Sequence, residues 1–206
     1  MWFGDSIRVD LVRYTPEPVE AAGRAAGICW DKEEKEDYGS FVKRIVRKGH
    51  ESVIEHVSFT FRIEGVSRAL THQLVRHRIA SYSQRSQRYV DEGEFGYVTP
   101  PRIERNEEAK KLFVKFMEDS DGLYHKLREM GIPKQDARFV LPNACESKII
   151  VTMNARSLRN FFRLRLARDA QWEIRRLATE MFDLVYEAAP ELFEDLREAA
   201  DLARKN

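Results

Sequence analysis

Residues 76–89 constrain this chain more than any other stretch, because four arginines, one histidine and three serines lie there without a carboxylate. The whole chain holds 35 Lys and Arg against 34 Asp and Glu, so the basic excess is local. Positive charges gathered in one segment repel each other unless an anion or an acidic partner lies among them. Guanidinium and hydroxyl groups donate hydrogen bonds that suit phosphate oxygens. The stretch therefore predicts an anion-binding site, with a nucleotide as the favoured ligand.

A purely structural explanation covers only the first half of this stretch. Arg76, His77 and Arg78 follow a predicted helix, and basic side chains there stabilise the free carbonyls and the dipole of a helix C-terminus. Arg85 and Arg88 lie beyond that helix end and need another partner. Both interpretations stay open for the first half, whereas the second half favours a ligand.

The charge balance and the cysteine content exclude several classes of protein. A net charge of +1 disfavours a protein that coats nucleic acid, since such domains carry a strong basic excess. No apolar run reaches membrane-spanning length, and the N-terminus lacks the features of a signal peptide. Only Cys29 and Cys145 are present, so no disulfide framework is expected. We expect a cytoplasmic protein without nucleic-acid or membrane partners, folded as a single domain over residues 1–206.

Hydrophobic periodicity predicts an α+β fold. Apolar and polar residues alternate in two predicted strands, at 7–11 and 57–63, and residues 148–153 are predicted as a third strand. Helical spacing and capping residues predict helices at 19–28, 38–48, 67–76, 106–130, 134–140, 157–167, 171–188 and 190–204. The basic stretch begins at the end of one of these helices and is expected to continue as a loop.

A second arginine cluster surrounds Arg165. On the predicted helix, Arg165 shares the apolar face with Phe161 and Phe162, at a position where an apolar residue is expected. A buried guanidinium needs a partner, because an unpaired buried charge is strongly destabilising. That partner is either a core carboxylate such as Glu173 or Glu180, or a ligand bound within the domain or across a subunit interface.

The histidines do not form a recognisable metal motif. His50, Glu55 and His56 follow the order H-E-x-x-x-E-H, which lacks the spacing of zinc-protease motifs. No further ligand completes a tetrahedral set, so a hydrogen-bonding role is favoured over metal binding. The sequence also lacks the glycine-rich loops that bind dinucleotides and nucleoside triphosphates, and neither cysteine has the His or Arg neighbours that would activate it. If the protein chemically alters a nucleobase, a redox cofactor bound by a different scaffold is the simplest alternative to a cysteine nucleophile.

Several segments together resemble the flavin-dependent thymidylate synthases. Residues 76–88 are similar to that family's signature R-H-R-x-x-S-x-x-x-x-S-x-R, although Ser83 and Gln84 differ from the residues often found there. Further similar segments, in the same order as in the family, are Gln73 and residues 49–56, 137–142, 154–158 and 170–175. The resemblance therefore covers most of the chain.

The resemblance implies α+β subunits with a central antiparallel sheet flanked by long helices, assembled as a homotetramer whose subunits share active sites. The implied reaction is the reductive methylation of dUMP to dTMP, with methylenetetrahydrofolate as one-carbon donor and NADPH-reduced FAD as hydride source. The residues implied to bind dUMP are Gln73, Arg76, Ser86, Gln87, Arg88, Arg138 and Arg165. Those implied to bind FAD are His50, Ser52, Glu55, Arg76, His77, Arg78, Ile79, Asn154, Arg156 and Asn160.

Two residues are singled out for the chemistry by this resemblance. Arg165 is expected to meet the uracil ring or its developing negative charge, which would explain a guanidinium at an apolar position. Ser86 is expected to position dUMP rather than attack it, because arginine neighbours cannot act as its base.

An alternative function is a non-catalytic nucleotide- or RNA-binding module that uses Tyr82 and Tyr89 as stacking platforms. This alternative leaves Arg165 without a role. Because a helix end and the loop after it need not face the same way, we also expect residues 76–78 and 86–88 to serve different active sites of one oligomer.

Overall fold

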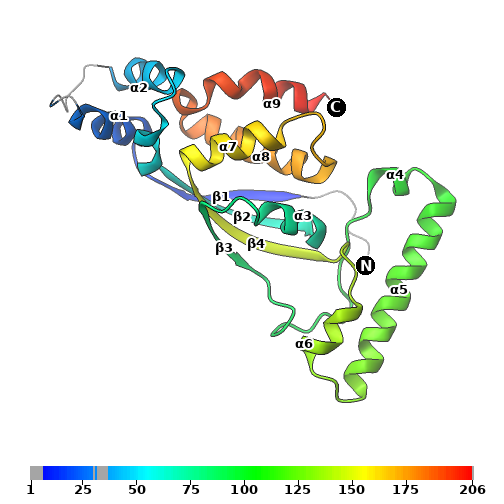
Figure 1. The fold of residues 1–206 in the computed structure, drawn as a ribbon. Coiled ribbons are helices and arrows are strands. Elements are labelled where there is room, and N and C mark those ends of the chain that lie inside the picture. The colour runs from blue at the N-terminus through cyan, green and yellow to red at the C-terminus, as the bar shows by residue number, and fades with distance from the viewer. Residues whose placement is uncertain (1–6, 30, 32–36, 206) are drawn as a thin grey trace. The chain divides into compact units, whose positions relative to one another are not determined.

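The computed structural model describes residues 7–29, 31 and 37–205 (Figure 1). The described residues fall into two compact units, each assembled from several chain segments. Of the described residues, unit 1 takes in 7–8, 63–72 and 83–149. Unit 2 takes in 9–29, 31, 37–62, 73–82 and 150–205. The single domain expected over residues 1–206 stays a prediction.

A four-stranded antiparallel sheet has the strand order β1-β2-β4-β3. Its strands are β1 (Arg8–Tyr14), β2 (Ser58–Ser67), β3 (Ala80–Gln84) and β4 (Glu146–Asn154). The α+β class and the three predicted strands are confirmed.

The loop expected beyond Arg78 is wrong for the five residues of β3. In this strand Ala80, Tyr82 and Gln84 are half-buried, while the serines between them are exposed. Gln84 fills an inward position with polar contacts, because its Nε2 donates to Thr71 Oγ1 at 3.0 Å and lies 3.1 Å from Ser147 Oγ. A polar residue at an inward position hides the alternation from which strands are predicted.

The core of unit 2 combines aliphatic side chains with several aromatic rings. The helices of unit 2 include α1 (Pro18–Ile28), α2 (Tyr38–Arg47), the 3₁₀ helix η1 (Glu51–His56), α7 (Ala155–Arg165) and α8 (Trp172–Ala188). Phe162 of α7 lies edge-on to Phe182 at 5.4 Å and to Phe193 at 5.8 Å between ring centroids. Edge-to-face pairs of this kind add to the stabilisation from burial.

The start of α7 is fixed by two hydrogen bonds. The Asn154 side chain accepts from the backbone N–H of Ser157 at 2.8 Å, as an N-cap residue does. The backbone N–H of Ala155 donates to the carbonyl of Val57 at 2.7 Å, directly after η1. The first turn of α7 is therefore held beside η1, within one unit.

The continuous helix predicted at 190–204 is wrong. The segment forms two 3₁₀ turns and a short helix, which are η3 (Pro190–Leu192), η4 (Glu194–Leu196) and α9 (Arg197–Arg204). The Leu192 carbonyl accepts from the Arg159 side chain at 2.6 Å, and the Leu196 N–H bonds to Phe193. An α-helix would need the Leu196 N–H to bond to Leu192 instead. Figure 1 shows α7, α8 and α9 lying beside one another.

Unit 1 contains the long predicted helix. Its elements are most of α3 (Arg68–Leu74), α4 (Pro101–Glu104), α5 (Glu107–Glu129), α6 (Lys134–Ala137) and the 3₁₀ turn η2 (Arg138–Val140). The predicted caps are confirmed, because Ser67 Oγ accepts from the Leu70 N–H and Asn106 Oδ1 from the Ala109 N–H, both at 3.0 Å. The helix predicted at 134–140 is shorter, since its second half is η2. Among the described residues, no helix combines the length and apolarity needed to cross a membrane.

Candidate functional site

Unit 2 contains a cavity of about 620 Å³, named the arginine cavity here. Its walls come from η1, from the segment after α3, and from α7 with the residue before it. The lining residues are Glu51, Glu55, Arg76, His77, Arg78, Ile79, Asn154, Arg156, Ser157, Asn160, Arg163, Leu164 and Arg165. All the predicted FAD-binding residues except His50 and Ser52 are therefore brought together, along with Arg165 of the dUMP set.

Arginines dominate the charge of the arginine cavity, where five guanidiniums face two carboxylates. Glu55 forms an ion pair with Arg156. Glu51 belongs to a separate network with α7. Within the described part of the chain, no carboxylate lies at ion-pair distance from Arg76 or Arg78, and both side chains are exposed. These two residues keep their donors available for an anion.

His77 is a neutral side chain of the basic segment that contacts α7. Its Nε2 accepts a hydrogen bond from Arg165 Nε at 3.1 Å, and its ring lies edge-on to Phe161 at 5.0 Å. Burial, and then repulsion from Arg165, lower the pKa of His77 to about 4. At neutral pH the ring is uncharged and carries one proton. Because Nε2 accepts a hydrogen bond from Arg165, that proton resides on Nδ1.

Tyr82 of β3 fastens the segment that carries these side chains. Its hydroxyl lies 2.8 Å from the carbonyl oxygens of both Leu74 and His77 and can donate to either. Burial raises the pKa of Tyr82 to about 12, so the hydroxyl remains a donor. One side chain therefore contacts both the end of α3 and the segment that joins α3 to β3.

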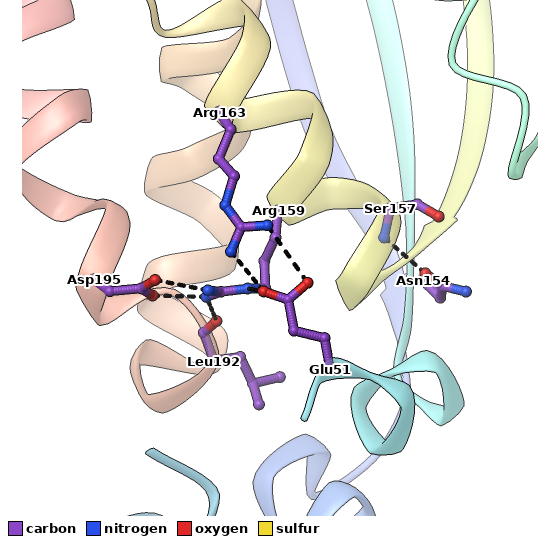
Figure 2. A network of polar contacts seen from close by, with 7 residues as sticks. All are labelled: Glu51, Asn154, Ser157, Arg159, Arg163, Leu192 and Asp195. Carbon is purple, nitrogen blue, oxygen red and sulfur yellow. Dashed lines mark hydrogen bonds and ion pairs between the residues drawn. The ribbon is translucent and has the colours of Figure 1, made fainter. Parts of the chain in front are cut away.

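Arg159 is the centre of a polar network behind the arginine cavity (Figure 2). It is 1% exposed, and its Nη1 and Nη2 donate to the two Asp195 oxygens at 2.7 Å each. Nη1 also donates to the Leu192 carbonyl at 2.6 Å, and Nε donates to Glu51 Oε1 at 3.0 Å. The same Glu51 oxygen accepts from Arg163 Nη2 at 2.5 Å. Figure 2 shows Glu51 pointing from η1 toward Arg159 and Arg163 of α7.

The buried guanidinium of α7 is thus Arg159, and the expected burial of Arg165 is wrong. Arg165 is half-buried at the last residue of α7, and its hydrogen bond goes to His77. Within the described residues, neither Glu173 nor Glu180 pairs with it. A side chain in the final turn can turn away from the core, which the helical pattern does not reveal.

Further cavity residues could have been found from helical spacing. Arg163 and Leu164 follow Arg156 and Asn160 by three to eight positions, so all four share one face of α7. Glu51 carries no such signal, because its arginine partners lie more than a hundred residues away.

Of the residues expected to bind dUMP, Arg76 and Arg165 line the arginine cavity, and Gln73 at the end of α3 is half-buried and also belongs to unit 2. The others lie in unit 1. Ser86 Oγ accepts from the Arg88 N–H at 3.3 Å. Gln87 is buried, and Arg138 Nε donates to a backbone carbonyl at 3.1 Å. The dUMP-binding role of these residues stays a prediction.

Arg85 has an acidic partner rather than a ligand. Its Nη2 lies 3.3 Å from Glu92 Oε2, and the Glu92 side chain is 1% exposed. Burial raises the pKa of Glu92, although the nearby Arg85 opposes that shift. The expectation that the second half of the basic stretch needs a ligand therefore applies to Arg88 alone.

His50 and Ser52 are both exposed and lie beside the cavity residues of η1 rather than among them. Across residues 7–29, 31 and 37–205, no three His, Cys, Asp or Glu side chains are close enough to hold a metal ion. Cys145 is buried, and burial raises the pKa of its thiol to about 12. It therefore lacks the thiolate that nucleophilic chemistry requires.

Comparison with known proteins gives a consistent result. The profile of a family described as thymidylate synthase complementing protein matches residues 10–191. The flavin-dependent thymidylate synthase of Clostridium tetani is 47% identical over 212 aligned residues, covering 91% of this chain and 85% of that protein. That of Geobacter sulfurreducens is 48% identical over 200, covering 92% and 86%.

A solved structure extends the likeness to three dimensions. The UMP/dUMP methylase PolB from Streptomyces cacaoi, bound with 5-Br dUMP, matches with a TM-score of 0.83 and 25% sequence identity. The match covers 92% of this chain and 93% of that one. Profile, relatives and structure agree, and the chain belongs to the family of flavin-dependent thymidylate synthases.

Proposed function

We propose that this chain catalyses the reductive methylation of dUMP to dTMP with FAD as its cofactor. The observation that carries the proposal is the arginine cavity, into which Arg76, His77 and Arg78 of the basic stretch converge with α7. The relatives named as flavin-dependent thymidylate synthases support it, as does the 5-Br dUMP bound to PolB. Methylenetetrahydrofolate is the proposed one-carbon donor, and NADPH the proposed reductant.

The residues of the arginine cavity fit FAD. A volume of about 620 Å³ lies within the range of sites that hold small ligands and cofactors. The diphosphate of FAD is anionic, and Arg76 and Arg78 offer guanidinium donors that no carboxylate of the described chain engages. The side-chain amides of Asn154 and Asn160 offer donors and acceptors for the polar edges of its rings. The chemistry that FAD supplies when bound is hydride transfer.

The chain's own side chains would act on this site through fixed charge and hydrogen bonding. Arg76 and Arg78 provide positive charge that does not change with pH, which favours an anion developing beside them. His77 remains neutral and holds its proton on Nδ1, because Nε2 accepts from Arg165. Arg165 is thereby oriented by a neutral acceptor, and its remaining donors stay available for the uracil of dUMP.

Binding of dUMP is proposed for Gln73, Arg76, Ser86, Gln87, Arg88, Arg138 and Arg165. Ser86 would donate a hydrogen bond to the nucleotide, since its hydroxyl contacts the backbone of Arg88 and has no adjacent base. Arg88, which lies 5.6 Å from the ring centre of Tyr89, is exposed and can reach a phosphate.

The assembly is proposed as a cytoplasmic homotetramer of single-domain subunits with shared active sites. Residues 76–78 line the arginine cavity within unit 2, whereas residues 86–88 belong to unit 1. We propose that these two segments serve different active sites of one oligomer, and that folate binds on the flavin side.

Anaerobic spectroscopy of the purified protein tests the proposed function. Protein incubated with FAD and freed of unbound cofactor should be yellow, and NADPH should bleach its absorbance. Arg78→Gln should weaken FAD binding about tenfold or more, because a charge-assisted hydrogen bond is lost. Arg47→Gln, which removes an exposed guanidinium from α2, should leave the affinity unchanged. Wild-type protein that stays colourless at saturating FAD would overturn the proposal.

A further inference from the structure

Arg159 uses its guanidinium to join three segments of unit 2. Asp195 lies in η4, Leu192 in η3 and Glu51 in η1, and each accepts a hydrogen bond from it within 3.0 Å. The side chain lines no part of the arginine cavity, yet it is almost fully buried behind it. Its position cannot be explained by contact with a ligand.

Glu51 is the point at which this network reaches the cavity. Its carboxylate lines the cavity and binds both Arg159 and the cavity residue Arg163. Although burial opposes the shift, hydrogen bonds from Arg163 and Arg159 lower the pKa of Glu51. The carboxylate is therefore ionised and shared between a buried guanidinium and an exposed one.

Three ion pairs from two carboxylates consequently fix η1 against α7. Glu51 pairs with Arg159 and Arg163, and Glu55, four residues further on, pairs with Arg156. The Glu55–Arg156 pair is exposed on both sides, so solvent weakens it. The Glu51–Arg159 pair contains a buried guanidinium with bidentate support from Asp195, which makes it the more rigid constraint.

We infer that Arg159 is a positioning residue of the arginine cavity. Acting through Glu51, it holds η1 where Glu51 and Glu55 can line the site, without touching the ligand. This inference rests on the proposed function, in which the arginine cavity binds FAD. A lysine could not replace Arg159, because one ammonium group cannot reach Glu51, Asp195 and Leu192 with the same planar set of donors.

A double-mutant cycle on FAD affinity tests this role. The four proteins are wild type, Arg159→Met, Glu51→Gln and the double variant, and the Kd of each for FAD is measured by quenching of flavin fluorescence in the apoprotein. Arg159→Met should weaken FAD binding about tenfold in the wild-type background but less than about twofold in the Glu51→Gln background. The unpaired Asp195 is common to both Arg159→Met proteins, so its effect cancels.

Leu192→Ala separates positioning from loss of stability. Leu192 is fully buried, and its backbone carbonyl, which accepts from Arg159, survives the substitution. This variant should lower the melting temperature and leave the FAD Kd within about twofold of wild type. If Leu192→Ala weakens FAD binding as much as Arg159→Met does, Arg159 is merely structural and the inference is overturned.

The remaining outcomes are also decisive. Equal effects of Arg159→Met in the two backgrounds would show that Arg159 does not act through Glu51, and would leave the proposed function intact. A wild-type protein without FAD affinity would instead overturn the proposed function. Should Arg159→Met fail to fold, Arg159→Lys keeps the buried charge, and the same cycle with this variant should show the same coupling to Glu51→Gln.

Discussion

Arg165 Nε donates a hydrogen bond to His77 Nε2 across 3.1 Å, joining the end of α7 to the basic segment that follows α3. Both partners line the arginine cavity. The contact requires an unprotonated Nε2, and the positive charge of Arg165 disfavours protonation of the ring. A cationic side chain is therefore oriented by a neutral one, and among the described residues no carboxylate forms an ion pair with Arg165.

His77 should make the stability of the protein depend on pH between about 4 and 6.5. Burial and Arg165 lower the pKa of His77 from 6.5 to about 4, so within this window the unfolded chain binds a proton that the folded chain does not. The stabilisation that the neutral His77 ring gives the folded protein is present in full above pH 6.5 and is lost as the pH falls through about 4. Because the ring is half-buried, we expect a loss of roughly 1–2 kcal/mol.

Urea unfolding measures this effect. Between about pH 7 and pH 4.5, His77→Gln should lose less stability than wild type, since glutamine has no proton to bind in this window. The two proteins share every other ionisable group, so the contributions of those groups cancel in the difference. Identical losses in the two proteins would contradict the neutral state of His77.

Removal of the Arg165 charge should raise the pKa of His77. Arg165→Met eliminates both the repulsion and the donor that occupies Nε2, while the burial of the ring persists. The His77 pKa should therefore move upward but stay below 6.5. Titration of the imidazole ring protons by NMR reports it directly, and an unchanged pKa would show that the contact has no electrostatic effect.

Tyr82→Phe should loosen the segment that carries Arg76 and Arg78. The hydrogen bond that the hydroxyl donates to the carbonyl of Leu74 or His77 is lost, at a cost of roughly 1–2 kcal/mol in unfolding free energy. FAD affinity should fall as well, because these arginines are held less firmly. Tyr186→Phe is the matched control, since Tyr186 bonds to Glu194 away from the cavity residues and should affect stability alone. An equal loss of FAD affinity in both variants would contradict this role.

Ser86→Ala should reduce turnover without abolishing it. A donor to dUMP is lost, and we expect KM for dUMP to rise by about tenfold, which is typical of one hydrogen bond to a charged group. Ser83→Ala, at an exposed position of β3, should behave like wild type. Complete loss of turnover with unchanged dUMP affinity would instead assign Ser86 a chemical role.

Local sequence patterns were sufficient for most helices and three strands. Ser67 and Asn106 cap α3 and α5 through bonds to residues only three positions away, and such signals are visible in any short window. The cavity residues were brought together mainly by the resemblance to a family. Helical spacing alone would have joined Arg156, Asn160 and Arg163.

Contacts between distant segments could not be predicted in this way. Arg159 bonds to Glu51 across 108 positions and to Asp195 across 36, and nothing beside Arg159 in the sequence marks it as buried. Contacts with distant segments also explain why β3 was not predicted, because Gln84 bonds to side chains on other segments of unit 1. The first half of the predicted helix at 190–204 was wrong because Arg159 occupies the Leu192 carbonyl.

Formation of dTMP is the direct test of the proposed reaction. Purified protein supplied with FAD, dUMP, methylenetetrahydrofolate and NADPH should produce dTMP, detected by chromatography, and omission of any one component should stop the reaction. Arg78→Gln should require more FAD to reach half-maximal rate. The proposed function would be contradicted if FAD-loaded wild-type protein made no dTMP with every substrate present. It would also be contradicted if protein stripped of FAD made dTMP at an equal rate.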